Sequence, residues 1–226
     1  MSENIYIIGG SKGGVGKSFV TIALVDYLQK QNKDVLLVET DSANPDVWKI
    51  YNGTTAAVTA NLDEREGWIE LVNACHANPK AIVVINTAAR NNVGVSAYGD
   101  TLNLSLDELK RKLVTLWVIN RQRDSLELLK KYMDAIPTSD VHVVRNGYFG
   151  EERKFALYNG SELRKRVEER GGRSVNFPEL ADLVSDEIYS KRMSIERASK
   201  DLPLGQRAEL TRWRNDVAKM FEALAQ

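Results

Sequence analysis

The stretch Lys12-Gly13-Gly14-Val15-Gly16-Lys17-Ser18 decides the fold of this chain of 226 residues. It follows the apolar run Ile5–Ile8 and precedes a segment with helical periodicity that begins at Phe19. A strand, a glycine loop and a helix N-terminus in this order form a setting in which proteins bind phosphate groups. At average residue frequencies such a string should arise by chance roughly once in ten thousand chains of this length.

The residue types of this loop suit a polyphosphate. Glycines allow successive backbone N–H groups to turn toward an anion, and the following helix adds the positive end of its dipole. We expect Lys17 to reach the β- and γ-phosphates of a nucleotide and the Ser18 hydroxyl to bind Mg²⁺. A plain glycine turn would need neither residue. The predicted nucleotide-binding residues of the loop are Gly13, Gly14, Val15, Gly16, Lys17, Ser18 and Phe19.

Composition narrows the class of protein. A hydrophobic content of 43% supports one α/β domain over residues 1–226. The formal net charge is +0, which does not predict strong nonspecific binding to nucleic acid. The single cysteine, Cys75, excludes an internal disulfide and a cysteine-based metal cluster. The sequence shows neither a signal peptide nor an apolar run of about 20 residues, so we expect a cytoplasmic protein.

Strand-like and helix-like segments alternate along the chain, which predicts an α/β fold with three layers and a mostly parallel central sheet flanked by helices. The segment from Thr54 to Leu62 fits either a loop or a short helix. The predicted strands are Ile5–Ile8, Val35–Val38, Ala81–Ile85, Leu113–Ile119, Val141–Val144 and Ser174–Phe177. The predicted helices are Phe19–Gln31, Glu64–Ala77, Leu106–Lys112, Ser125–Ala135, a helix that Ser161 caps and Gly171-Gly172 ends, Glu179–Ala198 and Leu204–Ala225.

The glycine loop departs from the strict pattern G-x-x-x-x-G-K-[ST], because Ser11 occupies the first glycine position. It fits K-G-G-x-G-K-[ST] and therefore resembles the deviant Walker A loop of the ParA/MinD group of P-loop ATPases. The resemblance implies ATP and Mg²⁺ as ligands and an ATP-dependent homodimer that opens after slow hydrolysis. It also implies that Lys12 reaches the nucleotide of the partner subunit and acts with Lys17 in catalysis.

Two further segments match positions of this group. Asp41 follows the second predicted strand, where the group has an aspartate that positions the attacking water. The acid before it is Glu39, where the group has aspartate. After the third predicted strand, Asn86 stands where the group has an aspartate near Mg²⁺, so both Mg²⁺ affinity and turnover are in question. The expected metal site comprises Ser18, Glu39, Asp41 and Asn86, and Arg90–Gly99 is expected to be a mobile second switch.

The resemblance also places the adenine base. Asn146 ends the fifth predicted strand, where the group commonly has an asparagine whose amide reads the adenine edge. Pro178 follows the sixth predicted strand and matches a proline-bearing loop that lines the base.

The biological role follows from resemblance alone. The group contains partition, division-site and conjugative-transfer ATPases, and we favour plasmid partition, stability or transfer, with a protein partner that stimulates hydrolysis. Basic clusters such as Arg164-Lys165-Arg166 fit two interpretations, a surface that contacts DNA and a solvated helix face. Membrane contact through the last helix competes with packing on the sheet, which we favour. The alternatives are a nucleotide-binding scaffold that does not hydrolyse ATP, which Asn86 favours, and a metabolic ligase or kinase of the dethiobiotin synthetase type.

Overall fold

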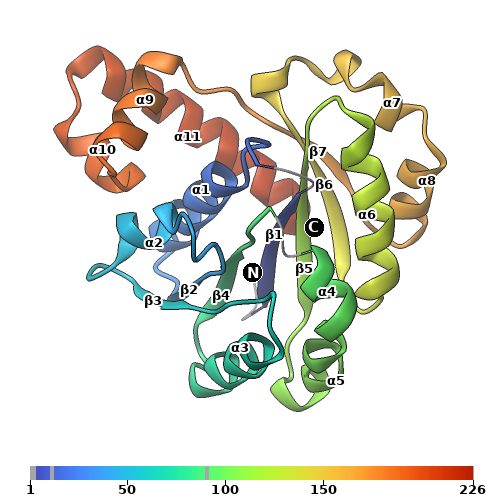
Figure 1. Cartoon of the computed structure of the whole chain (residues 1–226). Coiled ribbons are helices and arrows are strands. Elements are labelled where there is room, and N and C mark those ends of the chain that lie inside the picture. Colours follow the sequence, from blue (N-terminus) through green and yellow to red (C-terminus); the bar gives the residue numbers. More distant parts are fainter. Residues whose placement is uncertain (1–3, 11–12, 90–91, 226) are drawn as a thin grey trace.

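A parallel sheet forms the centre of the molecule. The computed structural model describes residues 4–10, 13–89 and 92–225. Within them, seven strands pair in parallel, which confirms the predicted α/β class (Figure 1). In spatial order they are β3 (Ala56–Thr59), β2 (Val35–Glu39), β4 (Ile82–Asn86), β1 (Ile5–Gly10), β5 (Leu113–Ile119), β6 (Asp140–Asn146) and β7 (Ser174–Phe177).

Helices cover both faces of this sheet, because alternate side chains of the buried strands point to opposite sides. In β1, Tyr6 and Ile8 join one apolar cluster, whereas Ile5 and Ile7 join the other. The first cluster includes α1 (Lys17–Lys30), α2 (Asp46–Tyr51), α9 (Asp182–Ser190), α10 (Ile195–Asp201) and α11 (Leu204–Ala225). The second includes α3 (Arg65–Ala77), α4 (Asn92–Tyr98), α5 (Asp100–Leu109), α6 (Arg123–Ala135), α7 (Ala156–Asn159) and α8 (Glu162–Glu169).

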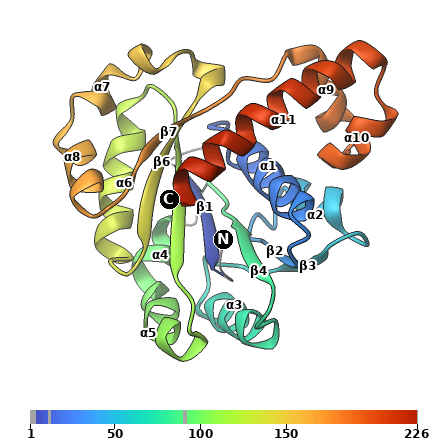
Figure 2. The ribbon, with the colours of Figure 1, turned by 180° about the vertical axis from the view of Figure 1, so that it is seen from behind.

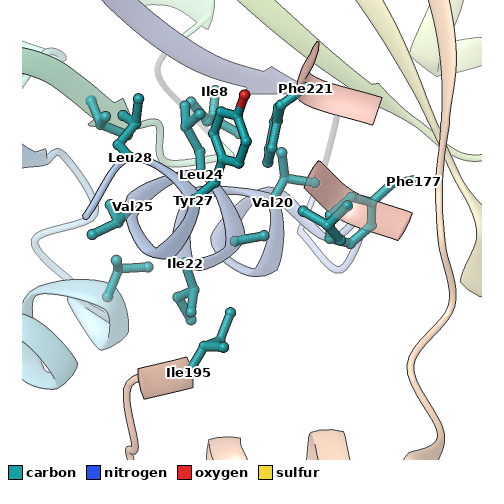
Figure 3. Packing of buried hydrophobic residues seen from close by; sticks show 14 of the residues in the cluster. Ile8, Val20, Ile22, Leu24, Val25, Tyr27, Leu28, Phe177, Ile195 and Phe221 are labelled. Carbon is teal, nitrogen blue, oxygen red and sulfur yellow. The ribbon is translucent and has the colours of Figure 1, made fainter. Parts of the chain in front are cut away.

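The last helix, α11, packs on the first, α1, which directly follows the glycine loop (Figure 2). The aromatic rings of Tyr27 and Phe221 meet with their centroids 5.1 Å apart (Figure 3). Trp213 and Phe221 are fully buried, and Val217 is 3% exposed. The apolar face of α11 is therefore part of the core, as predicted, and is not available to a membrane.

The prediction of a loop or a short helix over Thr54–Leu62 is wrong for Ala56–Thr59, because these residues form the edge strand β3. Leu36 of β2 lies opposite Ala56, and Glu39 lies opposite Thr59. The strand is mostly exposed, so its sequence shows no apolar alternation that would have revealed it. Backbone pairing to β2 holds it in the sheet. The short helix α2, which precedes it, was also not predicted.

The predicted helix over Glu179–Ala198 is two helices. Arg192 adopts a left-handed conformation with φ of 47°, which ends α9. The hydroxyl of Ser194 then accepts a hydrogen bond from the Arg197 N–H and caps α10. Glycine is the usual residue at a left-handed position, and an arginine there is uncommon. Because Arg192 stands at this position, the sequence gives no sign of the break.

The expectation of a mobile loop over Arg90–Gly99 is wrong for the part that the structure describes, where α4 spans Asn92–Tyr98. Val95 is buried in the core against the sheet. A Cβ on Gly94 would lie 1.8 Å from the carbonyl oxygen of Leu62. Gly94 therefore permits a close approach between α4 and the chain after β3, and it does not mark flexibility. Arg90 and Asn91 lie outside the described residues.

Candidate nucleotide-binding site

The glycine loop leaves β1 and enters α1 through a backbone that only glycine adopts easily. Gly14 and Gly16 have φ of 79° and 101°, and Gly16 directly precedes the helix. Gly13 and Gly14 are exposed, whereas Val15 is buried and anchors the loop in the core. The loop therefore presents its backbone at the N-terminus of a helix of 14 residues, where the dipole favours anions. Lys12, predicted to be catalytic, lies outside the described residues.

Lys17 and Asp41 interact electrostatically in the candidate site. Lys17 is the first residue of α1 and only 8% exposed. Burial lowers the pKa of Lys17 to about 8, and the nearby charge of Asp41 opposes this shift. Asp41 follows β2 and is half-buried, and its carboxylate accepts a hydrogen bond from the Asn44 N–H. A buried cation beside a carboxylate, next to an anion-binding helix end, is suited to a phosphate with a bound water.

Glu39 and Asn86 lie next to each other at the ends of two paired strands. They are register partners of β2 and β4. Asn86 Nδ2 lies 2.9 Å and 3.1 Å from the two carboxylate oxygens of Glu39, to which it donates. Glu39 Oε1 also accepts from the Asp41 N–H at 3.0 Å. Burial raises the pKa of Glu39, which is 1% exposed, and these hydrogen bonds partly offset the shift.

Thr21 and Thr40 support this pair, and sequence reasoning did not single them out. Thr21 Oγ1 lies 3.0 Å from both Asn86 Oδ1 and the carbonyl oxygen of Lys17, one helical turn before it. Thr40 Oγ1 donates to the Asn86 carbonyl oxygen and accepts from the Ala88 N–H, both at 3.0 Å. Thr21 is four residues after Lys17, so helical spacing places both on the same face of α1, and this spacing could have indicated that Thr21 belongs to the site.

The side chains of the predicted metal site offer oxygen atoms as ligands, from a hydroxyl, two carboxylates and an amide. Ser18 is half-buried in the first turn of α1. Glu39 and Asn86 end the neighbouring strands β2 and β4, and Asp41 follows β2. No group of three or more His, Cys, Asp or Glu side chains among the described residues is arranged to hold a metal ion. The side-chain oxygens of the predicted site are the ligand type that Mg²⁺ prefers, and Mg²⁺ usually completes its shell with water and phosphate oxygens.

Asn146 lies directly beside the glycine loop. Its Nδ2 donates to the Val15 carbonyl oxygen at 2.9 Å, and its Oδ1 accepts from the Tyr148 N–H at 3.1 Å. A Cβ on Gly16 would lie 2.2 Å from Asn146 Nδ2, so the glycine makes this approach possible. The amide therefore fixes the loop in this structure. Its role as a reader of adenine stays a prediction.

A pocket of about 450 Å³ extends from the loop toward β7 and α9. Pro178 lies in its wall together with Asn146. Phe19 stacks on Trp213 with ring centroids 5.2 Å apart, and Trp213 Nε1 donates to the Pro178 carbonyl oxygen at 2.8 Å. Trp213 belongs to the last helix, for which the sequence predicts packing on the sheet and no contact with this pocket. The remaining lining residues are Gly14, Gly16, Tyr148, Phe177, Glu179, Leu180, Asp182, Ser185, Asp186 and Tyr189.

The polarity of this pocket changes along its length. Its wall at the loop includes Gly14 and Gly16, and its wall toward α9 includes three acidic residues, Glu179, Asp182 and Asp186. Carboxylates repel phosphate but accept hydrogen bonds from hydroxyl and amino groups. A nucleotide fits this arrangement when its phosphates lie at the loop and its ribose and base lie toward α9, where hydroxyl and amino groups can donate to the carboxylates.

A family model described as the CobQ/CobB/MinD/ParA nucleotide-binding domain matches residues 6–146, which contain the loop, Asp41 and Asn86. The chain belongs to this family, and its fold is that of a ParA/MinD-type nucleotide-binding protein. A curated relative, "Protein MobD" of Acidithiobacillus ferrooxidans, is 69% identical over 224 residues and covers 99% of each chain.

Solved structures agree with the fold. The septum site-determining protein MinD of Pyrococcus horikoshii, complexed with Mg-ADP, matches with a TM-score of 0.61 and 15% identity over 100% of this chain and 98% of that one. A MinC:MinD complex from Aquifex aeolicus matches with a TM-score of 0.58 and 15% identity, over 97% and 96% of the chains. In the part of this chain that the structure describes, no helix has the length and apolar character needed to cross a membrane.

Proposed function

We propose that this protein is an ATPase that uses ATP-dependent homodimerisation and slow hydrolysis as a switch in plasmid mobilisation. The observation that carries the ATPase is the buried Lys17 at the start of α1, which interacts electrostatically with Asp41 and directly follows Gly16 of the pocket wall. The mobilisation role rests on the relative named MobD. The Mg-ADP complex of a protein with the same fold supports this choice of ligand.

Each residue has a role in this proposal. Backbone N–H groups from Gly13 to Phe19 hold the phosphates, and Lys17 contacts the β- and γ-phosphates. Ser18, Glu39, Asp41 and Asn86 would hold Mg²⁺, which would neutralise charge on the transferred phosphate when bound. Asp41 orients the attacking water, and its electrostatic interaction with Lys17 supports this role. Phe19, Asn146 and Pro178 enclose the base.

The dimer rests on the resemblance at Lys12, which would reach the nucleotide of a second copy. Its partners would include a protein that stimulates hydrolysis. The MinC:MinD complex shows that a protein of the same fold binds a protein partner. The basic cluster on α8 offers little for direct DNA contact. Arg164 pairs with Glu168, Lys165 with Glu162 and Arg166 with Asp134. We therefore assign any DNA association to an adaptor protein.

A scaffold that binds ATP without hydrolysing it is the second candidate. The observation that favours it is Asn86, which donates its amide to Glu39 and carries no charge of its own. Without a carboxylate at this position, the site has one negative charge fewer for Mg²⁺ than the ParA/MinD pattern.

ATP binding and phosphate release in the wild type, Lys17→Ala and Lys30→Ala test the proposal. Lys30 is the exposed last residue of the same helix, so Lys30→Ala is a matched control. Charged hydrogen bonds contribute about 1.5–3 kcal/mol, so Lys17→Ala should weaken ATP binding by about 10- to 100-fold, and Lys30→Ala should not. Binding with no phosphate release by the wild type would favour the scaffold. A wild type that binds no ATP would refute both.

A further inference from the structure

A second groove, of about 610 Å³, lies between α2 and the turn that joins α9 to α10 (Figure 1). Two segments that are far apart in the chain form its walls. One wall contains Asn44, Asp46 and Ile50, and the other contains Tyr189, Ser190, Lys191 and Arg192. Apart from Tyr189, none of these residues lines the nucleotide pocket. The volume of the groove is within the range of about 300–1,000 Å³ that ligand sites have.

Arg192 is the unusual residue of this groove. Its φ of 47° is left-handed, which is a costly conformation for a residue with a Cβ. Lys191 beside it pairs with Glu187, and Asp46 on the opposite wall pairs with Lys49. In contrast, no residue that the structure describes forms an ion pair or a side-chain hydrogen bond with the Arg192 guanidinium. A strained residue whose charge serves no contact within the described chain indicates a role for that charge toward a ligand.

The charge and the openness of the groove favour an acidic segment of another protein. The Arg192 guanidinium is complementary to a carboxylate, which it can bind through two parallel hydrogen bonds. Ile50 and Tyr189 add apolar surface for a neighbouring side chain of the segment. Tyr189 is 43% exposed, so a small molecule in this groove would remain more open to water than ligands in pockets usually are. Asp46 and Glu187 would repel the phosphates of a nucleic acid.

The groove is connected to the nucleotide site at two points. Asn44 donates its backbone N–H to the Asp41 carboxylate at 3.1 Å and its side-chain amide to Asp46 at 2.8 Å. Tyr189 lines both the groove and the nucleotide pocket, and its ring centroid lies 5.5 Å from that of Phe19. A bound segment that moves Asn44 or Tyr189 would therefore change the position of Asp41 or the wall of the nucleotide pocket.

We propose that this groove binds an acidic segment of a partner protein through Arg192, and that the bound segment acts on the nucleotide site through Asn44 and Tyr189. Binding of the segment depends only on the groove. Its action on the nucleotide site rests on the proposed function, because it requires that the neighbouring pocket holds a nucleotide.

The test uses a phage-displayed library of random short peptides, which is depleted on Arg192→Gly and then selected on the wild type. Glycine adopts the left-handed conformation without strain, so Arg192→Gly should be at least as stable as the wild type in thermal unfolding. Arg192→Asn replaces it if it does not fold, since asparagine also tolerates this conformation. Arg197→Ala is the matched control, because Arg197 is an exposed arginine of α10 that pairs with Asp201 and does not line the groove.

The recovered peptides should be enriched in Asp and Glu. In calorimetry with one such peptide, Arg192→Gly should weaken binding by about 10- to 100-fold, and Arg197→Ala should leave it unchanged. Replacing the acids of the peptide by their amides should cost the same factor. Recovery of no peptide, or of peptides without acidic residues, overturns the inference. Binding of double-stranded DNA that Arg192→Gly abolishes also overturns it, because the groove would then be a nucleic-acid site.

The action on the nucleotide site is measured with the same peptide. Bound ADP and Mg²⁺ should change the affinity of the peptide by about 5- to 150-fold, because two coupled sites change each other's affinity by the same factor. Equal affinity with and without ADP and Mg²⁺ overturns this action and leaves the groove as a binding site. If the wild type binds no ADP, the proposed function fails together with this action, whereas the selection of acidic peptides still decides the role of Arg192.

Discussion

Replacing Trp213 by alanine should destabilise the protein strongly and loosen the nucleotide pocket. Trp213 is fully buried on α11, stacks on Phe19 of α1 and meets the edge of Phe177 at 5.6 Å. Its indole N–H donates to the Pro178 carbonyl oxygen. Truncation to alanine therefore removes a core ring, two aromatic contacts and a buried hydrogen bond at once.

The magnitude follows from this environment. Truncation of a buried aromatic residue typically costs about 3–5 kcal/mol. In a protein of this size, each kcal/mol corresponds to about 2–4 °C in Tm, so Trp213→Ala should lower the melting temperature by about 6–20 °C. Trp213→Phe keeps most of the packing but leaves the Pro178 carbonyl without its donor, at a cost of about 1–3 kcal/mol.

Thermal and urea unfolding of the nucleotide-free protein measure the effect, with Leu204→Ala as the control. Leu204 is on the same helix but is 76% exposed, so its truncation should change stability by less than about 0.5 kcal/mol. ADP binding by Trp213→Phe measures the contribution of the Pro178 contact to the pocket. If Trp213→Ala unfolds like the wild type, α11 does not pack on α1 as described and its apolar face is free for another partner.

Four further outcomes follow from the site and the core. Burial lowers the pKa of Lys17 from 10.5 to about 8, so between these values the unfolded chain binds more protons. The wild type should therefore gain stability relative to Lys17→Met as pH rises from about 8 to 10.5, and equal slopes in pH-dependent urea unfolding would contradict this. Asn146→Ala should weaken ADP binding because the Val15 carbonyl loses its donor, and calorimetry would show this; unchanged affinity would mean that the loop holds its shape without Asn146. Thr40→Val should cost about 1–3 kcal/mol in urea unfolding, because the Ala88 N–H loses its acceptor. Gly94→Ala should destabilise by about 1–3 kcal/mol through the clash with Leu62, measured by thermal unfolding, and a wild-type melting temperature would refute the close packing of α4.

The sequence was sufficient where local chemistry and periodicity agreed. The glycine loop is flanked by a fully buried strand and a long helix, and that order alone predicts the P-loop fold. The last helix was predicted with its observed bounds, Leu204–Ala225, because one apolar face runs along its whole length. The family model that matches residues 6–146 confirms the ParA/MinD resemblance inferred from the loop.

The sequence was insufficient where backbone contacts or distant partners decide the structure. β3 is held by pairing with β2 and has no apolar alternation. The break after α9 occurs at Arg192, where no glycine or proline marks it. In the candidate site, Asn86 and Glu39 each read as an isolated departure from the family pattern. Only the register of β4 on β2 shows that they face one another.

The most direct test of the central claim is the molecular mass in solution, measured by light scattering with and without ATP and Mg²⁺, for the wild type and Lys12→Ala. The account predicts a monomer without nucleotide, a dimer with ATP and Mg²⁺, and a monomer in both conditions for Lys12→Ala. A wild type whose mass does not respond to ATP, or a dimer that Lys12→Ala leaves intact, would contradict the ATP-dependent switch.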